Sequence, residues 1–90
     1  MMGEDITITL PHGLHARPSA LIITKIKDLN IESATITKDS TIINLKSILS
    51  MMTLGASQGT VIKVKAEGPD ADKALKIVKD VLTGKEGSFS

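Results

Sequence analysis

Apolar residues recur along this chain with two different periods, and the order of these periods is the strongest constraint on its fold. Residues 6–10, Ile-Thr-Ile-Thr-Leu, alternate apolar and polar side chains, which predicts a half-buried strand ended by Pro11. From Arg17 to Leu29 the apolar residues follow helical spacing instead, and Pro18 is tolerated in the first turn, where no N–H is needed. The chain therefore opens with a strand followed by a helix.

Two further strands and a short helix are expected in the middle of the chain. Glu32–Lys38 and Thr41–Leu45 are rich in β-branched residues and flank a turn at Asp39-Ser40, which is the pattern of a hairpin. Ser47 suits the N-cap of a helix barely two turns long, which Gly55 can end in the left-handed conformation.

A fourth strand and a last helix complete the pattern. In Thr60–Ala66 the apolar residues alternate again, which predicts one packed and one wet face. Gly68-Pro69-Asp70 then caps a helix that Gly84 closes, with an apolar stripe formed by Ala74, Leu75, Ile77, Val78, Val81 and Leu82. This order predicts an α+β fold, an open-faced β-sandwich in which three helices cover one face of a four-stranded, mainly antiparallel sheet.

The length and the residue types limit the organisation of the chain. Its 90 residues allow one small domain, for which we expect a core over about residues 5–84 and a flexible tail over 85–90. Cysteine is absent, so neither a disulfide nor a thiolate metal site is available. With no signal peptide and no apolar run of membrane-spanning length, a cytoplasmic protein without membrane insertion is expected.

The charge balance argues against several classes of partner. Eleven Lys and Arg against ten Asp and Glu give a formal net charge of +1, which does not favour nucleic acids or membranes. The only aromatic residue is Phe89 in the tail, so bases and sugars find no stacking partner. The electrostatic effects that matter for function are therefore local.

The stretch Gly13-Leu14-His15-Ala16-Arg17-Pro18 carries the chemistry. It sets an imidazole and a guanidinium where the first strand gives way to the first helix. The N–H groups of a helix N-terminus attract anions, a guanidinium is shaped for phosphate, and a neutral imidazole presents a nucleophilic lone pair. A phosphoryl group on His15 is thus well placed. Because no nucleotide-binding loop, hydrolase elbow or carboxylate pair accompanies it, a partner protein must supply that group.

This stretch and a second motif, Asn-Leu-Lys-Ser-Ile at 44–48 leading through Met52 to Leu54-Gly55, together resemble a known family. It is the histidine-containing phosphocarrier proteins (HPr) of the phosphoenolpyruvate-dependent sugar phosphotransferase system. The Gly-x-Asp pattern at 68–70 is also similar, and the resemblance covers about residues 6–82. It implies a carrier that receives a phosphoryl group from enzyme I and passes it to the A domains of enzymes II. Such a carrier forms a phosphohistidine, needs no cofactor and has no independent turnover.

The resemblance also implies roles for individual residues. Nδ1 of His15 would accept the phosphoryl group, Arg17 would stabilise it, and the amides of Ala16 and Arg17 would donate to its oxygens. In some members a serine kinase/phosphorylase modifies the serine of the Lys-Ser-Ile motif, here Ser47, and this controls the binding of partners and regulatory proteins. On helix statistics alone the Ser47 hydroxyl is an N-cap, and the two roles are compatible.

A docking surface is expected beside His15. The apolar residues of the short helix cannot all face the core, and flexible Met side chains adapt to several partners. Three lysines, Lys25, Lys27 and Lys46, can supply a charged rim that attracts an acidic partner. The residues expected at this interface are Ala20, Leu21, Ile48, Leu49 and Met52.

Three other interpretations stay open. His12 could join His15 in a metal site, but no carboxylate or thiol cluster completes one, so no metal is expected; His12 also departs from the small polar residue commoner in the family. The chain could be a purely regulatory HPr-like module, which His15 and Arg17 argue against. It could also be a carrier for nitrogen regulation or dihydroxyacetone phosphorylation, although the Lys-Ser-Ile motif favours the sugar system. We expect a monomer.

Overall fold

All seven predicted elements are present in the computed structural model, which describes residues 2–11, 13 and 16–84. The predicted tail, residues 85–90, lies outside this part of the chain. No helix among the described residues is long and apolar enough to cross a membrane. In chain order the elements are β1 (Met2–Thr7), α1 (Ala16–Ile26), β2 (Ser33–Lys38), β3 (Thr41–Asn44), α2 (Ile48–Thr53), β4 (Val61–Glu67) and α3 (Ala71–Leu82).

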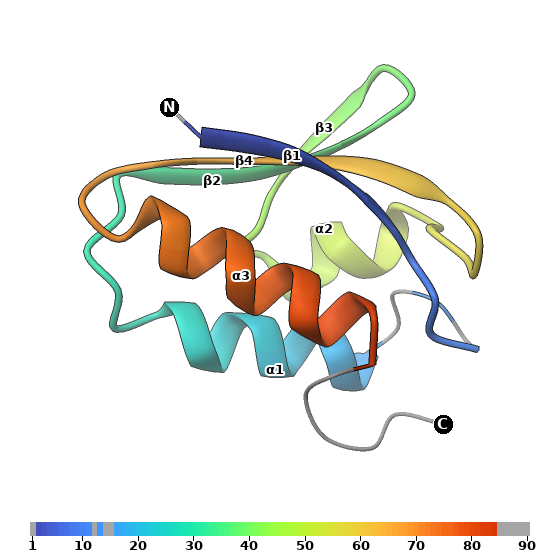
Figure 1. Ribbon diagram of the computed structural model, residues 1–90. Coiled ribbons are helices and arrows are strands. Elements are labelled where there is room, and N and C mark those ends of the chain that lie inside the picture. Colours follow the sequence, from blue (N-terminus) through green and yellow to red (C-terminus); the bar gives the residue numbers. More distant parts are fainter. Residues whose placement is uncertain (1, 12, 14–15, 85–90) are drawn as a thin grey trace.

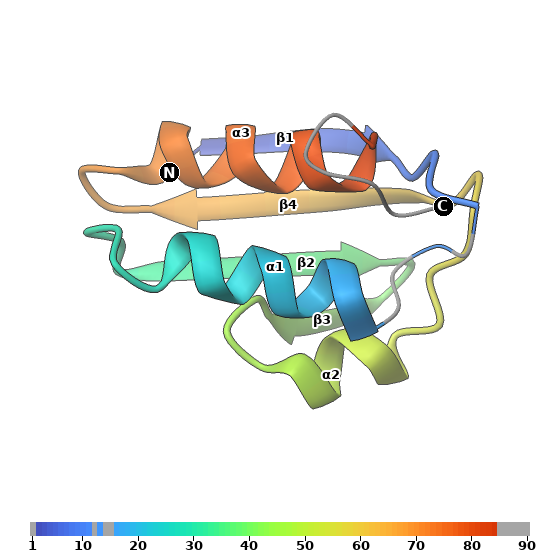
Figure 2. The same ribbon diagram turned by 90° about the horizontal axis from the view of Figure 1, so that it is seen from below.

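The strands form one antiparallel sheet in the order β1-β4-β2-β3. Figure 1 shows α1 and α3 beneath this sheet, and Figure 2, the view from below, shows the helices on one side of it. In both views α1 lies beside α3, and α2 lies beside the N-terminal half of α1. The predicted open-faced β-sandwich is therefore confirmed.

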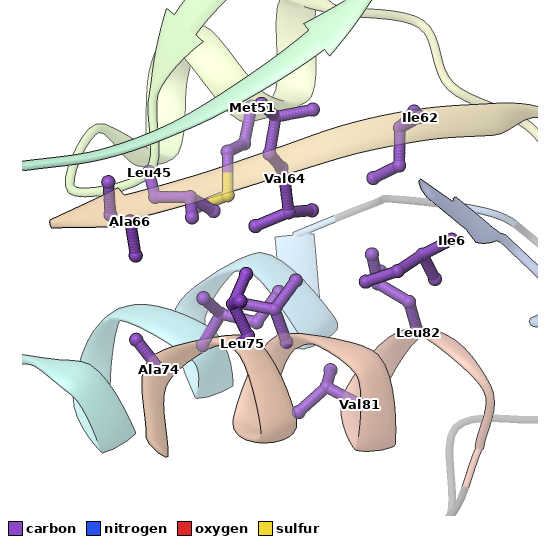
Figure 3. Close-up of a cluster of buried hydrophobic side chains, with 14 of the residues drawn as sticks. Ile6, Leu45, Met51, Ile62, Val64, Ala66, Ala74, Leu75, Val81 and Leu82 are labelled. Carbon is purple, nitrogen blue, oxygen red and sulfur yellow. The ribbon is translucent and has the colours of Figure 1, made fainter. Parts of the chain in front are cut away.

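The hydrophobic core fills the space between the inner face of the sheet and the helices. On β4 the inward side chains Ile62, Val64 and Ala66 are buried, as the alternating pattern predicts. Figure 3 shows them opposite the buried side chains of α3, among them Leu75 and Leu82. Each fully buried aliphatic side chain contributes roughly 1.5–3 kcal/mol, so this packing is the main source of stability in a chain without disulfides.

The first strand differs from its prediction at both ends. It runs over Met2–Thr7 rather than Ile6–Leu10, because backbone pairing with β4 continues back to Met2 despite the polar side chains there. Beyond Thr7 the amide of Ile8 still donates to the carbonyl of Thr60 at 2.9 Å, but the amide of Thr9 donates to the carbonyl of Leu82 at the end of α3 over 3.0 Å. The alternation in residues 6–10 thus predicts correctly which side chains are buried, but it does not predict the bounds of the strand.

The end of α1 differs from its prediction, whereas Asp70 caps α3 as predicted but forms an additional contact. Helix α1 ends at Ile26 rather than Leu29, because the amide of Leu29 donates to the carbonyl of Ile26 in a tighter turn. Asp70 stands at the N-cap of α3, but its carboxylate accepts no hydrogen bond from a backbone amide of that helix. It accepts one from the amide of Asn30 instead, at 2.8 Å, and so ties the loop before β2 to the start of α3.

Candidate functional site

The structure describes the surroundings of the predicted acceptor rather than the acceptor itself. His15, Leu14 and His12 lie outside the described residues, so the role of His15 and the expected absence of a metal at the two histidines stay predictions. The described neighbours in the chain are Gly13 before it and Ala16 after it.

Helix α1 begins at Ala16, directly after His15. The side chains of Ala16 and Arg17 are exposed, Pro18 is buried, and the first turn carries no acidic residue. Because the first N–H groups of a helix have no acceptor within it, the amides of Ala16 and Arg17 can donate to an anion, while Pro18 removes no helical hydrogen bond. The start of α1 therefore offers two amide donors and a guanidinium, with no competing carboxylate in its first turn.

Gly13 packs against the loop from α2 to β4, residues 54–60. It is buried, its φ is +67°, and its amide donates to the carbonyl of Leu10 over 3.0 Å. A Cβ at this position would lie 2.6 Å from the Cα of Ser57 and would also overlap the carbonyl oxygen of Ala56. A glycine at position 13 thus allows the backbone two positions before His15 to pack directly against the backbone of residues 56 and 57.

Loop 54–60 is also tied to the chain just after β1. The side-chain amide of Gln58 donates to the carbonyl of Thr9 at 3.2 Å, and the amide of Gly59 donates to the carbonyl of Ile8 at 2.8 Å. Gln58 could be interpreted from the sequence only as satisfying a turn or a strand end. The hydrogen bond of Gln58 and the contact of Gly13 both join segments that are far apart in the chain. The glycine at position 13 was the one feature of the sequence that could have indicated them.

Helix α2 begins and ends as predicted. The amide of Ser50 donates to Oγ of Ser47 over 3.2 Å, which makes Ser47 the N-cap. Gly55 follows the helix with a φ of +70°. The turn before the helix is closed by Asn44, whose Oδ1 accepts the amide of Lys46 at 2.8 Å.

The two adjacent methionines of α2 differ in their exposure to solvent. Met51 is fully buried, whereas Met52 is 46% exposed and Leu49 is 71% exposed. These values agree with the expectation that part of the helix faces the core and part faces solvent. The side chain of Ile48 lies outside the described part of the structure.

The other predicted interface residues lie on α1. Ala20 and Leu21 are both half-buried, and Leu21 packs against the core. Since α2 lies beside the N-terminal half of α1 (Figure 2), the structure brings Ala20, Leu21, Leu49 and Met52 onto two adjacent helices.

Charge is segregated along the chain around these helices. Residues 6–27 and 40–66, which include all of α1 and α2, contain no Asp or Glu, although the chain has ten acidic residues. Arg17, Lys27 and Lys46 are exposed within these segments, and Lys25 is half-buried. The predicted cationic rim is therefore not interrupted by carboxylates of residues 6–27 or 40–66.

Together these features define a class of protein. The domain is small, the start of α1 is exposed with free amide donors and a guanidinium, and the neighbouring helix presents apolar side chains within cationic segments. Such a surface suits a protein that holds an anionic group and exchanges it with other proteins.

Comparisons with known proteins identify the family within this class. The family model described as the PTS HPr component phosphorylation site matches residues 3–83. The phosphocarrier protein HPr of Buchnera aphidicola is 36% identical over 83 residues, which is 92% of this chain and 96% of that protein. The crystal structure of HPr-C-His from Thermoanaerobacter tengcongensis superposes with a TM-score of 0.83 at 39% identity, over 91% of each chain. The chain therefore belongs to the HPr family of phosphocarriers of the phosphotransferase system.

A larger protein contains a similar segment. The multiphosphoryl transfer protein of Haemophilus influenzae is 38% identical over 72 residues, which is 78% of this chain but 14% of that protein.

Proposed function

We propose that this chain is a cytoplasmic, monomeric carrier that accepts a phosphoryl group on Nδ1 of His15 from phosphorylated enzyme I. It then donates this group to the A domains of sugar-specific enzymes II. The observation that carries the proposal is the start of α1 directly after His15, with its free first-turn amides and exposed Arg17, in a member of the HPr family.

The transfer needs little covalent chemistry from the chain. The lone pair of neutral His15 attacks phosphorus, and the bond between phosphorus and the donor breaks as the bond to Nδ1 forms. Donation to the next protein is the same step with His15 as the leaving group. Arg17 and the amides of Ala16 and Arg17 donate to the phosphoryl oxygens. Because both side chains at this helix start are exposed, water weakens the grip and the group remains easy to release.

Partner docking involves the adjacent surfaces of α1 and α2. A large exposed Leu and a flexible Met beside a helix start are suited to packing against more than one partner. The cations Arg17, Lys27 and Lys46 would attract an acidic partner surface and raise the association rate. The proposed interface comprises Ala20, Leu21, Ile48, Leu49 and Met52.

Phosphorylation of Ser47 by a serine kinase/phosphorylase would regulate this docking. Oγ of Ser47 already accepts the amide of Ser50, so phosphate oxygens can retain the N-cap role and the fold need not change. The added negative charge would stand next to Leu49 and would repel the acidic surface that the cations attract. Docking would fall while stability is kept.

The acceptor role is tested by intact mass after incubation with enzyme I and phosphoenolpyruvate. The expected result is one acid-labile phosphoryl group on the wild type and on Ser47→Ala, and none on His15→Ala. If neither the wild type nor any variant is modified, the regulatory-module interpretation is the better one.

The docking surface is tested by a matched pair of variants. Leu49→Ser removes an exposed apolar side chain from α2, and Val61→Ser removes one from β4, where the side chain is 57% exposed. We expect Leu49→Ser to raise the KM for phosphorylation by enzyme I about tenfold or more, as loss of an interface anchor does, and Val61→Ser to leave it unchanged. Equal effects of the two variants would argue against the proposed surface.

A further inference from the structure

Lys38 occupies an unusual place at the end of β2. In this strand Ala34 and Ile36 face the core, and the alternation places Lys38 on the same inward side, where it is half-buried. Its ammonium lies 3.4 Å from the carbonyl oxygen of Leu54 and 3.3 Å from that of Gly55. A cation on the inner side of a strand is costly unless it is paired, and here both of its partners are backbone carbonyls.

The two carbonyls directly follow α2, on its C-cap residue Leu54 and on the next residue, Gly55. Such terminal carbonyls have no donor within the helix, and in the described part of the chain Lys38 is the hydrogen-bond donor that reaches them. A helix of six residues is not stable alone, so its direction is set by what holds its ends. Ser47 caps the start of α2, and Lys38 links its end to the sheet.

The same contact leads to the segment beside the acceptor. Gly55 is followed directly by Ala56 and Ser57, the backbone against which Gly13 packs. A shift of the carbonyl of Gly55 would therefore move the surface that supports the chain two residues before His15. Lys38 is itself on β2, so it reaches residues 54 and 55 from the sheet rather than from α1 or α2.

We propose that Lys38 is a positioning residue that holds residues 54–57 to the sheet, and through them both the docking helix α2 and Gly13 before the phosphoryl acceptor. This inference rests on the proposed carrier function for its kinetic consequence, but its structural consequence is independent of that function.

The structural consequence is measured by amide hydrogen exchange. Lys38→Met keeps the apolar stem and removes the donors, whereas Lys38→Arg keeps donors on a stem of similar length. Lys63→Met is the matched control, because Lys63 lies on the uncovered face of the sheet. For Lys38→Met we expect the amide of Leu54, which closes α2, to exchange about two- to tenfold faster, while Val64 in the core is unchanged. Lys38→Arg and Lys63→Met should both resemble the wild type.

The kinetic consequence is a rise in the KM for phosphorylation by enzyme I in Lys38→Met, restored in Lys38→Arg and absent in Lys63→Met. Unchanged exchange at Leu54 would overturn the inference. A raised KM with unchanged exchange would mean that Lys38 contacts the partner directly, which also overturns it. If wild type is not phosphorylated at all, the carrier function fails, and the exchange measurement still decides whether Lys38 positions residues 54–57.

Discussion

Replacement of Gly13 by alanine should destabilise the protein far more than an alanine at a glycine of the same backbone conformation. Gly13 and Gly55 have φ values of +67° and +70°, so a side chain at either site costs about 1–2 kcal/mol for the left-handed conformation. The gain from restricting the unfolded chain is the same for both and cancels in the comparison. The two sites differ only in their neighbours.

The neighbours set the size of the difference. At Gly55 the nearest atom to a new Cβ is Nζ of Lys38 at 4.0 Å, an ordinary contact. At Gly13 the new Cβ would lie 2.6 Å from the Cα of Ser57 and would overlap the carbonyl of Ala56, and both are backbone atoms that cannot rotate away. Forced overpacking of this kind adds about 1–3 kcal/mol. We therefore expect a loss of about 2–5 kcal/mol for Gly13→Ala and about 1–2 kcal/mol for Gly55→Ala.

The comparison is made by urea and thermal unfolding followed by circular dichroism. In a domain of this size 1 kcal/mol corresponds to about 4–8 °C in Tm, so Gly13→Ala should melt at least that far below Gly55→Ala. Free energies of unfolding that agree within about 0.5 kcal/mol for the two variants would refute the close contact between Gly13 and loop 54–60, because differences of that size are within the usual error of such comparisons.

Three further predictions follow from single side chains. Ser19 is fully buried and its Oγ has no hydrogen-bond partner among the described residues, so Ser19→Ala should raise the free energy of unfolding by about 1 kcal/mol; a loss would show that the hydroxyl is satisfied. Ser47→Ala removes the N-cap bond to Ser50 and should cost about 0.5–2 kcal/mol in urea unfolding, while a neutral result would discount that bond. The hydrogen bond and the charge of Glu4 raise the pKa of Lys79 above its ordinary 10.5. The contribution of this pair is thus present at neutral pH and is lost as pH rises from 10.5 through the folded pKa, so the stability gap between wild type and Lys79→Met should shrink in that window relative to neutral pH.

The fold was predictable because its elements have a strong local signal. Alternation in β4 and the apolar stripe of α3 both follow from side-chain burial, and both were confirmed with shifts of about one residue at the ends. The predicted bounds of β1 were displaced because the polar residues after Met2 pair with β4 through backbone groups. Such pairing leaves no pattern in the side chains. The carboxylate of Asp70 could not be assigned for a similar reason, since Asn30 reaches it from a distant loop.

The site was predictable only in part. The capping role of Ser47 is local and was readable from the sequence, whereas the division of Met51 from Met52 needed the packing of α2 against α1. The side chains of Gln58 and Lys38 bond to backbone carbonyls that are separated from them by 49 and by 16 or 17 positions. Such contacts exist only once the sheet has brought the segments together.

Following one phosphoryl group onto this chain and off it again tests the carrier function itself. The protein is phosphorylated with enzyme I and phosphoenolpyruvate, separated from both, and mixed with enzyme II A domains from the same organism, and the intact mass of each protein is followed in time. We expect the phosphoryl group to leave this chain and to appear on an A domain, and we expect His15→Ala neither to gain it nor to pass it on. A group that stays on this chain or is released only as inorganic phosphate, whichever A domain is supplied, would contradict the carrier function.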